Sequence, residues 1–194
     1  NEDFDFSEIA TYISTDEEII IALSKSKFLK KVLYLPLNDI QAITSESIVE
    51  LISSPNLHPF FDIDSLIQET KTILNDEVLK SMAGNPLCVN NLYEIDLQGT
   101  KGVSEDGIIT LLTSTHLSPG FNINNLLENI RYKYERNPGK IIKCLKNTTF
   151  ASQIKSLNIS EYFVTDDILG DLLINPNPFR KLKRLNLSET KMEK

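Results

Sequence analysis

The stretch that decides the predicted fold reads Leu92-Tyr93-Glu94-Ile95-Asp96-Leu97-Gln98-Gly99-Thr100, and continues with Val103-Ser104-Glu105-Asp106-Gly107-Ile108. Residues 95–97 alternate apolar and other residues, which is typical of a short strand with one buried edge, and Leu92 extends this segment upstream into an L-x-x-L-x-L pattern. Ser104 and the two acids after it favour a helix start. A hydroxyl there accepts a hydrogen bond from the first turn, and acids suit the positive end of the helix dipole. The stretch therefore predicts a strand followed by a helix.

The same helix-start pattern recurs along the chain. Each copy consists of an aliphatic residue, then Ser, Thr or Asn, then acids, and copies begin at residues 13, 43, 74, 103 and 164. A further copy begins at 136, where Asn137-Pro138-Gly139 stands in place of the cap. In the copy at 103, Ile108, Leu111 and Leu112 fall on one face of a helix, and the other copies place apolar residues at the same offsets. The pattern predicts a helix about every 30 residues.

A short alternating segment precedes each predicted helix. These segments are residues 4–6, 35–37, 61–63, 95–97, 121–123, 157–159 and 185–187. Because one strand and one helix cannot bury their apolar faces alone, we expect the copies to stack, with the strands in one parallel sheet and the helices on its other side. Segments that begin with Phe, at 4, 61 and 121, alternate with the others, and residues 66–73 and 126–134 add helical turns to these longer copies.

These features resemble the leucine-rich repeats, in particular the ribonuclease-inhibitor-like and cysteine-containing subclass, and residues 92–108 match that pattern best. The resemblance implies an α/β solenoid, a horseshoe with parallel strands on the concave side and helices on the convex side. Short and long repeats of about 30 residues would alternate in it. We therefore expect residues 1–194 to form a single leucine-rich-repeat domain of about six to seven repeats, as a fragment of a longer protein.

Charge is distributed unevenly along the chain, whose net charge is −7. Residues 1–97 hold 6 Lys or Arg and 17 Asp or Glu, a net charge of −11, and residues 98–194 hold 14 and 10, a net charge of +4. An acidic half argues against nucleic acid as a partner, because binding to a phosphate backbone depends on Lys and Arg along the contact. The longest apolar run, Ile19 to Leu23, is far shorter than the roughly 20 residues of a membrane-spanning helix, so we expect no membrane segment.

Residue types that carry catalysis or hold metals are sparse. The two histidines, His58 and His116, fall in equivalent loops of the two long repeats and lack ligand spacing. Cys88 and Cys144 predict free thiols in a reducing compartment, with Cys144 on a buried helical face. We therefore expect no enzyme, no cofactor and no metal site, and a cytoplasmic, monomeric protein. An enzyme with an unrecognised site remains the least favoured alternative.

What remains is a surface that binds another protein. Residues between the buried strand positions point outward along the concave face, and such a row is how repeat proteins bind extended partners. The row changes from acidic to basic along the chain. We expect a protein–protein interaction module, or alternatively the substrate-recognition part of a ubiquitin-ligase adaptor, or a microbial effector delivered into a host cell. The predicted partner-binding residues are Tyr34, Asp62, Tyr93, Glu94, Asp96, Asn122, Lys155, Asn158, Lys183, Arg184 and Asn186.

Overall fold

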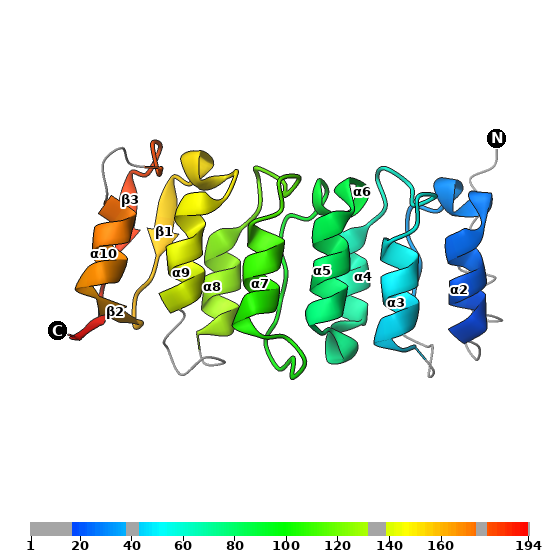
Figure 1. Cartoon of the computed structure of the whole chain (residues 1–194), viewed down its shortest axis with the longest axis horizontal. Helices are drawn as coiled ribbons and strands as arrows, with labels where there is room; N and C mark the ends of the chain where they lie inside the picture. The colour runs from blue at the N-terminus through cyan, green and yellow to red at the C-terminus, as the bar shows by residue number, and fades with distance from the viewer. Residues whose placement is uncertain (1–16, 38–42, 132–138, 174–177, 194) are drawn as a thin grey trace.

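The computed structural model describes residues 17–37, 43–131, 139–173 and 178–193. Figure 1 shows its main helices side by side in a row along the long axis, and the colour changes steadily along this row. The order of the helices along the row therefore follows their order in the chain. A second layer of helices, strands and non-helical segments lies behind the row.

The front row consists of one helix from each copy of the helix-start pattern, and each helix contacts the next one. We call this row the helix layer. It contains α2 (Glu17–Lys25), α3 (Ser45–Ile52), α5 (Asp76–Gly84), α7 (Glu105–Leu112), α9 (Gly139–Cys144) and α10 (Asp166–Leu173). Short helical pieces connect the layers: α6 (Pro86–Val89) and 3-10 helices at Lys27–Lys31, Lys71–Ile73, Leu145–Asn147 and Ala151–Gln153.

The predicted caps begin the helices of this layer. The side chains of Thr44, Asn75 and Ser104 each accept a hydrogen bond from the backbone N–H three residues later, at the starts of α3, α5 and α7. Ile108, Leu111 and Leu112 of α7 are fully buried, as their spacing predicts. These helix starts and this buried face are confirmed. The predicted start at residue 13 and the cap at 137–139 lie, wholly or in part, outside the described residues.

The second layer alternates between helices and other elements. In order it contains residues 32–37, α4 (Ile63–Glu69), residues 92–97, α8 (Ile123–Ile130), β1 (Ser156–Asn158) and β3 (Arg184–Asn186). We call this set the mixed layer. In Figure 1, α4 and α8 lie behind the helix layer.

Hydrogen bonds fix the order of the mixed layer. The N–H of Asp62, just before α4, donates to the carbonyl of Leu33 at 2.7 Å, and the N–H of Asn122, just before α8, donates to the carbonyl of Tyr93 at 2.7 Å. On the other side of α4, the carboxylate of Asp64 accepts a hydrogen bond from the N–H of Tyr93 at 3.3 Å. Residues 92–97 therefore lie between the two helices.

The C-terminal part of the mixed layer is a small sheet. The side chain of Asn124 in α8 donates to the carbonyl of Ser156 at 3.0 Å and accepts from the N–H of Asn158 at 2.9 Å, which ties α8 to β1. β1 pairs in parallel with β3, with Leu157 opposite Leu185. A second parallel pair joins β2 (Phe163–Thr165) to β4 (Lys191–Glu193).

The predicted leucine-rich-repeat solenoid, with a parallel strand in every repeat, is wrong. Among the described residues, strands occur only as the two parallel pairs near the C-terminus. Segments 61–63 and 121–123, predicted as strands, instead begin α4 and α8, because Asp62 and Asn122 cap these helices. Each helix separates the non-helical segments on either side of it, so residues 32–37 and 92–97 cannot pair and no horseshoe-shaped sheet forms. The predicted segment 4–6 lies outside the described residues.

One apolar core fills the space between the layers. It combines side chains such as Leu51 and Leu79 from the helix layer with Leu35, Leu66 and Leu97 from the mixed layer. Cys88 and Cys144 are free thiols, as predicted, and both are buried, which the sequence predicted for Cys144 alone. Burial raises the pKa of Cys144 to about 12 and also raises that of Cys88. Neither thiol therefore forms a reactive thiolate at neutral pH.

None of the helices in the described stretches combines the length and the apolar character that crossing a bilayer requires.

Candidate protein-binding face

The predicted partner-binding residues all lie on the mixed layer, and none of them is buried. Their side chains are spread over six successive elements rather than one sheet. Tyr34 lies in residues 32–37, Asp62 directly precedes α4, and Tyr93, Glu94 and Asp96 lie in residues 92–97. Asn122 directly precedes α8. In the sheet, Lys155 precedes β1 and Asn158 lies in it, while Lys183 precedes β3 and Arg184 and Asn186 lie in it. The face has three parts: an acidic hollow, an apolar edge and a basic end.

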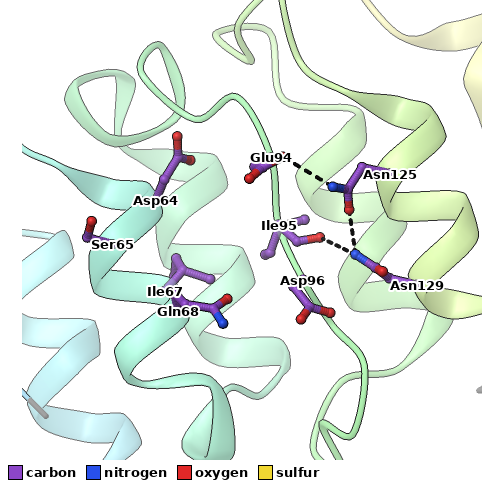
Figure 2. A pocket seen from close by; sticks show the side chains of 9 residues that line it. All are labelled: Asp64, Ser65, Ile67, Gln68, Glu94, Ile95, Asp96, Asn125 and Asn129. Atoms are coloured by element: carbon purple, nitrogen blue, oxygen red, sulfur yellow. Dashed lines mark hydrogen bonds between the residues drawn. The ribbon is translucent and has the colours of Figure 1, made fainter.

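The acidic hollow is a cavity of about 460 Å³ between α4 and α8, with residues 92–97 running through it (Figure 2). Three carboxylates, those of Asp64, Glu94 and Asp96, line it. The other lining residues are Ser65, Ile67, Gln68, Ile95, Asn125 and Asn129. Sequence analysis placed Glu94 and Asp96 on this face and did not include Asp64, which directly follows the predicted strand segment 61–63.

The carboxylates of the hollow differ in their electrostatic surroundings. Burial raises the pKa of Asp64, and the nearby charges of Asp62 and Glu94 raise it further, against the opposing effect of backbone hydrogen bonds. Burial also acts to raise the pKa of Asp96, but a hydrogen bond and the charge of Lys71 outweigh it, so this pKa lies below its usual value. Asp96 is therefore neutralised within the chain, whereas Asp64 lies among like charges.

Amide side chains form the α8 wall of the hollow. Asn125 donates a hydrogen bond to the Glu94 carboxylate at 3.1 Å. Asn129 donates to the side-chain oxygen of Asn125 at 2.5 Å and to the carbonyl of Ile95 at 3.5 Å. Figure 2 shows this chain of bonds from Glu94 to α8. The Glu94 carboxylate is thereby held in position at the rim.

α4 and α8 are equivalent helices that differ in charge. Positions 62, 64 and 69 in and beside α4 are Asp, Asp and Glu, whereas positions 122, 124 and 129, sixty residues later, are all Asn. Several roles are shared: Asp62 and Asn122 cap their helices, and Asp64 and Asn124 both accept a hydrogen bond from the backbone of the next segment. The exchange of carboxylate for amide accounts for much of the change in charge along the face.

The apolar edge consists of Leu33, Tyr34, Phe60 and Tyr93, four of the six large apolar side chains that are exposed in the described part of the chain. Phe60 is 75% exposed and Tyr93 is 55% exposed. The backbone hydrogen bond from Asp62 to Leu33 and the hydrogen bond from the side-chain amide of Asn91 to the carbonyl of Pro59 bring these residues to the same edge of the mixed layer. Sequence analysis included the two tyrosines and missed Leu33 and Phe60.

The basic end consists of Lys155, Lys183 and Arg184. The backbone N–H of Lys183 donates to the carbonyl of Lys155 at 2.8 Å, and Arg184 is opposite Ser156 in the sheet, so the three side chains come from adjacent strands. All three are exposed, and they form no ion pair with any other described residue. A second hollow, of about 440 Å³, lies beside Lys155 and is also lined by Asn122 and Gln153.

The candidate catalytic residue types do not come together. His58 accepts a hydrogen bond at Nδ1 from the N–H of Phe60 at 3.0 Å, and the ring of His58 lies 5.9 Å from that of Phe60. His116 lies in the equivalent loop before α8, as the sequence predicts. In the stretches that the structure describes, no group of His, Cys, Asp and Glu side chains is arranged to hold a metal ion.

No protein-family model matches this sequence, and neither a curated protein nor a solved structure matches it either, so the face has to be interpreted from its own geometry.

Proposed function

We propose that the chain is a protein-binding module that takes a segment of a partner protein across its mixed layer. The observation that carries this proposal is the gathering of exposed apolar side chains at the apolar edge, next to a charged, hollowed face. Contiguous exposed apolar groups on a folded protein mark interaction sites, and aromatic anchors dominate the binding energy of many protein interfaces.

Phe60 is exposed, whereas several other phenylalanine side chains of the described residues are buried in the core. The next residue, Phe61, is 2% exposed, and Phe121, Phe150 and Phe179 are buried as well. Covering a phenylalanine side chain is worth about 1.5 to 3 kcal/mol, so a partner that covers Phe60 gains an interaction that the chain itself leaves unused.

The ring and the backbone of Tyr93 are both held in place by neighbouring groups. A Cβ atom on Gly120 would lie 3.4 Å from Cε1 of the Tyr93 ring, so the ring rests against the backbone at Gly120. The backbone of Tyr93 is fixed from both sides, by Asp64 and by Asn122. An aromatic side chain that is already fixed loses little conformational entropy on binding, which favours affinity.

Capture of partners on immobilised protein tests the proposal. We expect proteins from a native lysate to be retained by the wild-type chain and lost from Phe60→Ser and Tyr93→Ser, as measured by quantitative mass spectrometry. Leu173→Ser is the matched control, because Leu173 is 59% exposed and lies in α10 of the helix layer. Proteins that are lost from Leu173→Ser and retained by both aromatic variants would place binding on the opposite layer and refute the proposal.

A further inference from the structure

We infer that the partner is an extended peptide segment whose charges come in a fixed order, with Lys or Arg over the acidic hollow and Asp or Glu over the basic end. This inference rests on the proposed function, because it specifies which segment the mixed layer would bind. It follows from the positions of the acidic hollow and the basic end, and from the amide side chains of α8 that lie between them.

The acidic end of the face, formed by the acidic hollow and Asp62 beside it, presents carboxylates that form no ion pair with a described residue: those of Asp62, Asp64 and Glu94. Asp62 is exposed, and both Asp62 and Glu94 lie close enough to Asp64 for their charges to add to the effect of burial in raising the pKa of Asp64. Glu94 has an amide partner, Asn125, which orients the carboxylate without cancelling its charge. A cationic side chain of a partner would relieve the repulsion among these carboxylates, and the neighbouring ring of Tyr93 offers contact to the aliphatic part of the same side chain.

The middle of the face presents mainly amide side chains, and α8 also bears one exposed carboxylate, that of Glu128. Asn122, Asn124, Asn125 and Asn129 lie along or just before α8, between residues 92–97 and β1. Amide side chains can both donate and accept hydrogen bonds, which suits the backbone or uncharged side chains of a peptide. A run of acidic residues in the partner would therefore gain nothing over α8.

The basic end presents the opposite charge. Lys155, Lys183 and Arg184 project from adjacent strands, and they form no ion pair with the described residues. A purely basic segment would be repelled here, and a nucleic acid would be repelled by the carboxylates at the acidic end. Only a segment with charges of both signs, separated along its length, is complementary to the whole face.

The distance between the ends sets the spacing of charges in the partner. A path from residues 92–97 to β1 crosses α8, and a helix with its side chains is about 10 Å across. With the spacing to the elements on each side, the span is roughly 15 to 20 Å, which an extended chain covers in about five or six residues at ~3.3 Å each. We expect the basic and acidic clusters of the peptide to be separated by that length.

A selection from random peptides tests this inference. A library of random 16-residue peptides displayed on phage is selected against the full chain, and the enriched sequences are read. We expect Lys or Arg clusters separated from Asp or Glu clusters by an uncharged spacer, with an aromatic or aliphatic residue beside the basic cluster. Enriched peptides without separated charges, or no enrichment, would overturn the inference.

A synthetic peptide from the selection then gives the quantitative test. We expect a peptide of the same composition with alternating charges to bind about tenfold or more weakly, as measured by fluorescence anisotropy. Glu94→Lys should weaken the selected peptide, whereas a peptide whose basic cluster is replaced by Ser should bind this variant and the wild type alike. Glu50→Lys and Lys80→Glu, at exposed positions of α3 and α5, are the matched controls and should bind like wild type.

The two proposals can fail separately. If binding is lost in Tyr93→Ser but is indifferent to charge order, the charge inference is wrong and the protein-binding module stands. If the selected peptides are purely basic or purely acidic, or if single-stranded DNA displaces them by competing for Lys183 and Arg184, the inference is also wrong. If selected peptides bind Tyr93→Ser and Glu94→Lys as tightly as wild type, they do not use this face and both proposals lose support.

Discussion

The carboxylate of Asp76, at the start of α5, accepts hydrogen bonds from both the backbone N–H and the hydroxyl of Ser104, the residue that caps α7, at 2.7 and 2.6 Å. The same carboxylate lies against Gly107, where an added Cβ would come within 2.1 Å of Asp76 Oδ1. Two successive helices of the helix layer are thus joined at their N-termini by one side chain, and the joint leaves no room for a methyl group.

Gly107→Ala should therefore destabilise the chain. Alanine favours a helix over glycine by about 1 kcal/mol, but here the methyl group would displace Asp76 and break its bonds to Ser104, and overpacking of this kind costs about 1 to 3 kcal/mol. Gly170→Ala is the control, because no atom lies within 4 Å of a Cβ at that position in α10. We expect chemical denaturation to show a lower midpoint for the first variant and an unchanged or higher one for the second. Equal gains in both would contradict the close approach at Gly107.

The buried face of α7 gives a second stability test. Leu111 is fully buried, whereas Thr110 is exposed and its hydroxyl donates to the carbonyl of Asp106 in the same helix. Leu111→Ala should lower the free energy of unfolding by about 2 to 5 kcal/mol, since it leaves a cavity between the layers. Thr110→Ala should change it little. Similar unfolding midpoints for the two variants would show that the assigned face of α7 is wrong.

The raised pKa of Asp64 predicts a stability change that depends on pH. A carboxyl whose pKa is higher in the folded than in the unfolded chain destabilises folding at neutral pH, and this effect disappears as the pH falls through the folded pKa to below the unfolded value. Asp64→Asn should therefore be more stable than wild type at pH 7 and equal to it at about pH 3. Asn124 shows that an amide can accept the same kind of backbone hydrogen bond. Thermal unfolding at both pH values measures this, and a variant less stable at pH 7 would contradict it.

The contribution of Asp96 to stability should depend on pH in the opposite direction. Its pKa is lowered in the folded chain by the hydrogen bond and charge of Lys71, against the effect of burial, so its contribution to stability is present above the unfolded pKa and is lost as the pH falls through the folded one. Lys71→Met should remove that contribution, and its loss of stability should be larger at pH 7 than at about pH 2. A loss that is the same at both pH values would mean that the pair acts through packing alone.

Sequence reasoning succeeded where the decisive chemistry is local. The caps at Asn75 and Ser104 and the buried stripe of α7 depend on residues within three or four positions of each other, and the structure has them as predicted. Asp62 and Asn122 were misread because three residues of apolar-polar-apolar sequence fit a strand and also a capped helix start. Ser65 and Asn125, whose backbone N–H groups bond to these caps, carried the distinguishing signal.

The candidate face was partly predictable for a related reason. The buried residues Leu92, Ile95 and Leu97 leave Tyr93 and Glu94 exposed whether or not the segment pairs with a neighbour, so their exposure did not depend on the wrong sheet. Phe60 was missed because the predicted binding residues were taken from the strand segments, and Phe60 lies in the loop just before the segment 61–63. Asp64 was missed because its place in the hollow depends on contact with Tyr93, 29 residues away, which no local pattern reveals.

Hydrogen–deuterium exchange of the chain, alone and with a captured partner, tests the binding face most directly. The account predicts slower exchange in the partner complex for residues 32–37, 92–97 and 183–186, and no change in the exposed parts of α3, α5 and α7. Protection confined to α3, α5 and α7, with residues 92–97 exchanging as in the free chain, would contradict it.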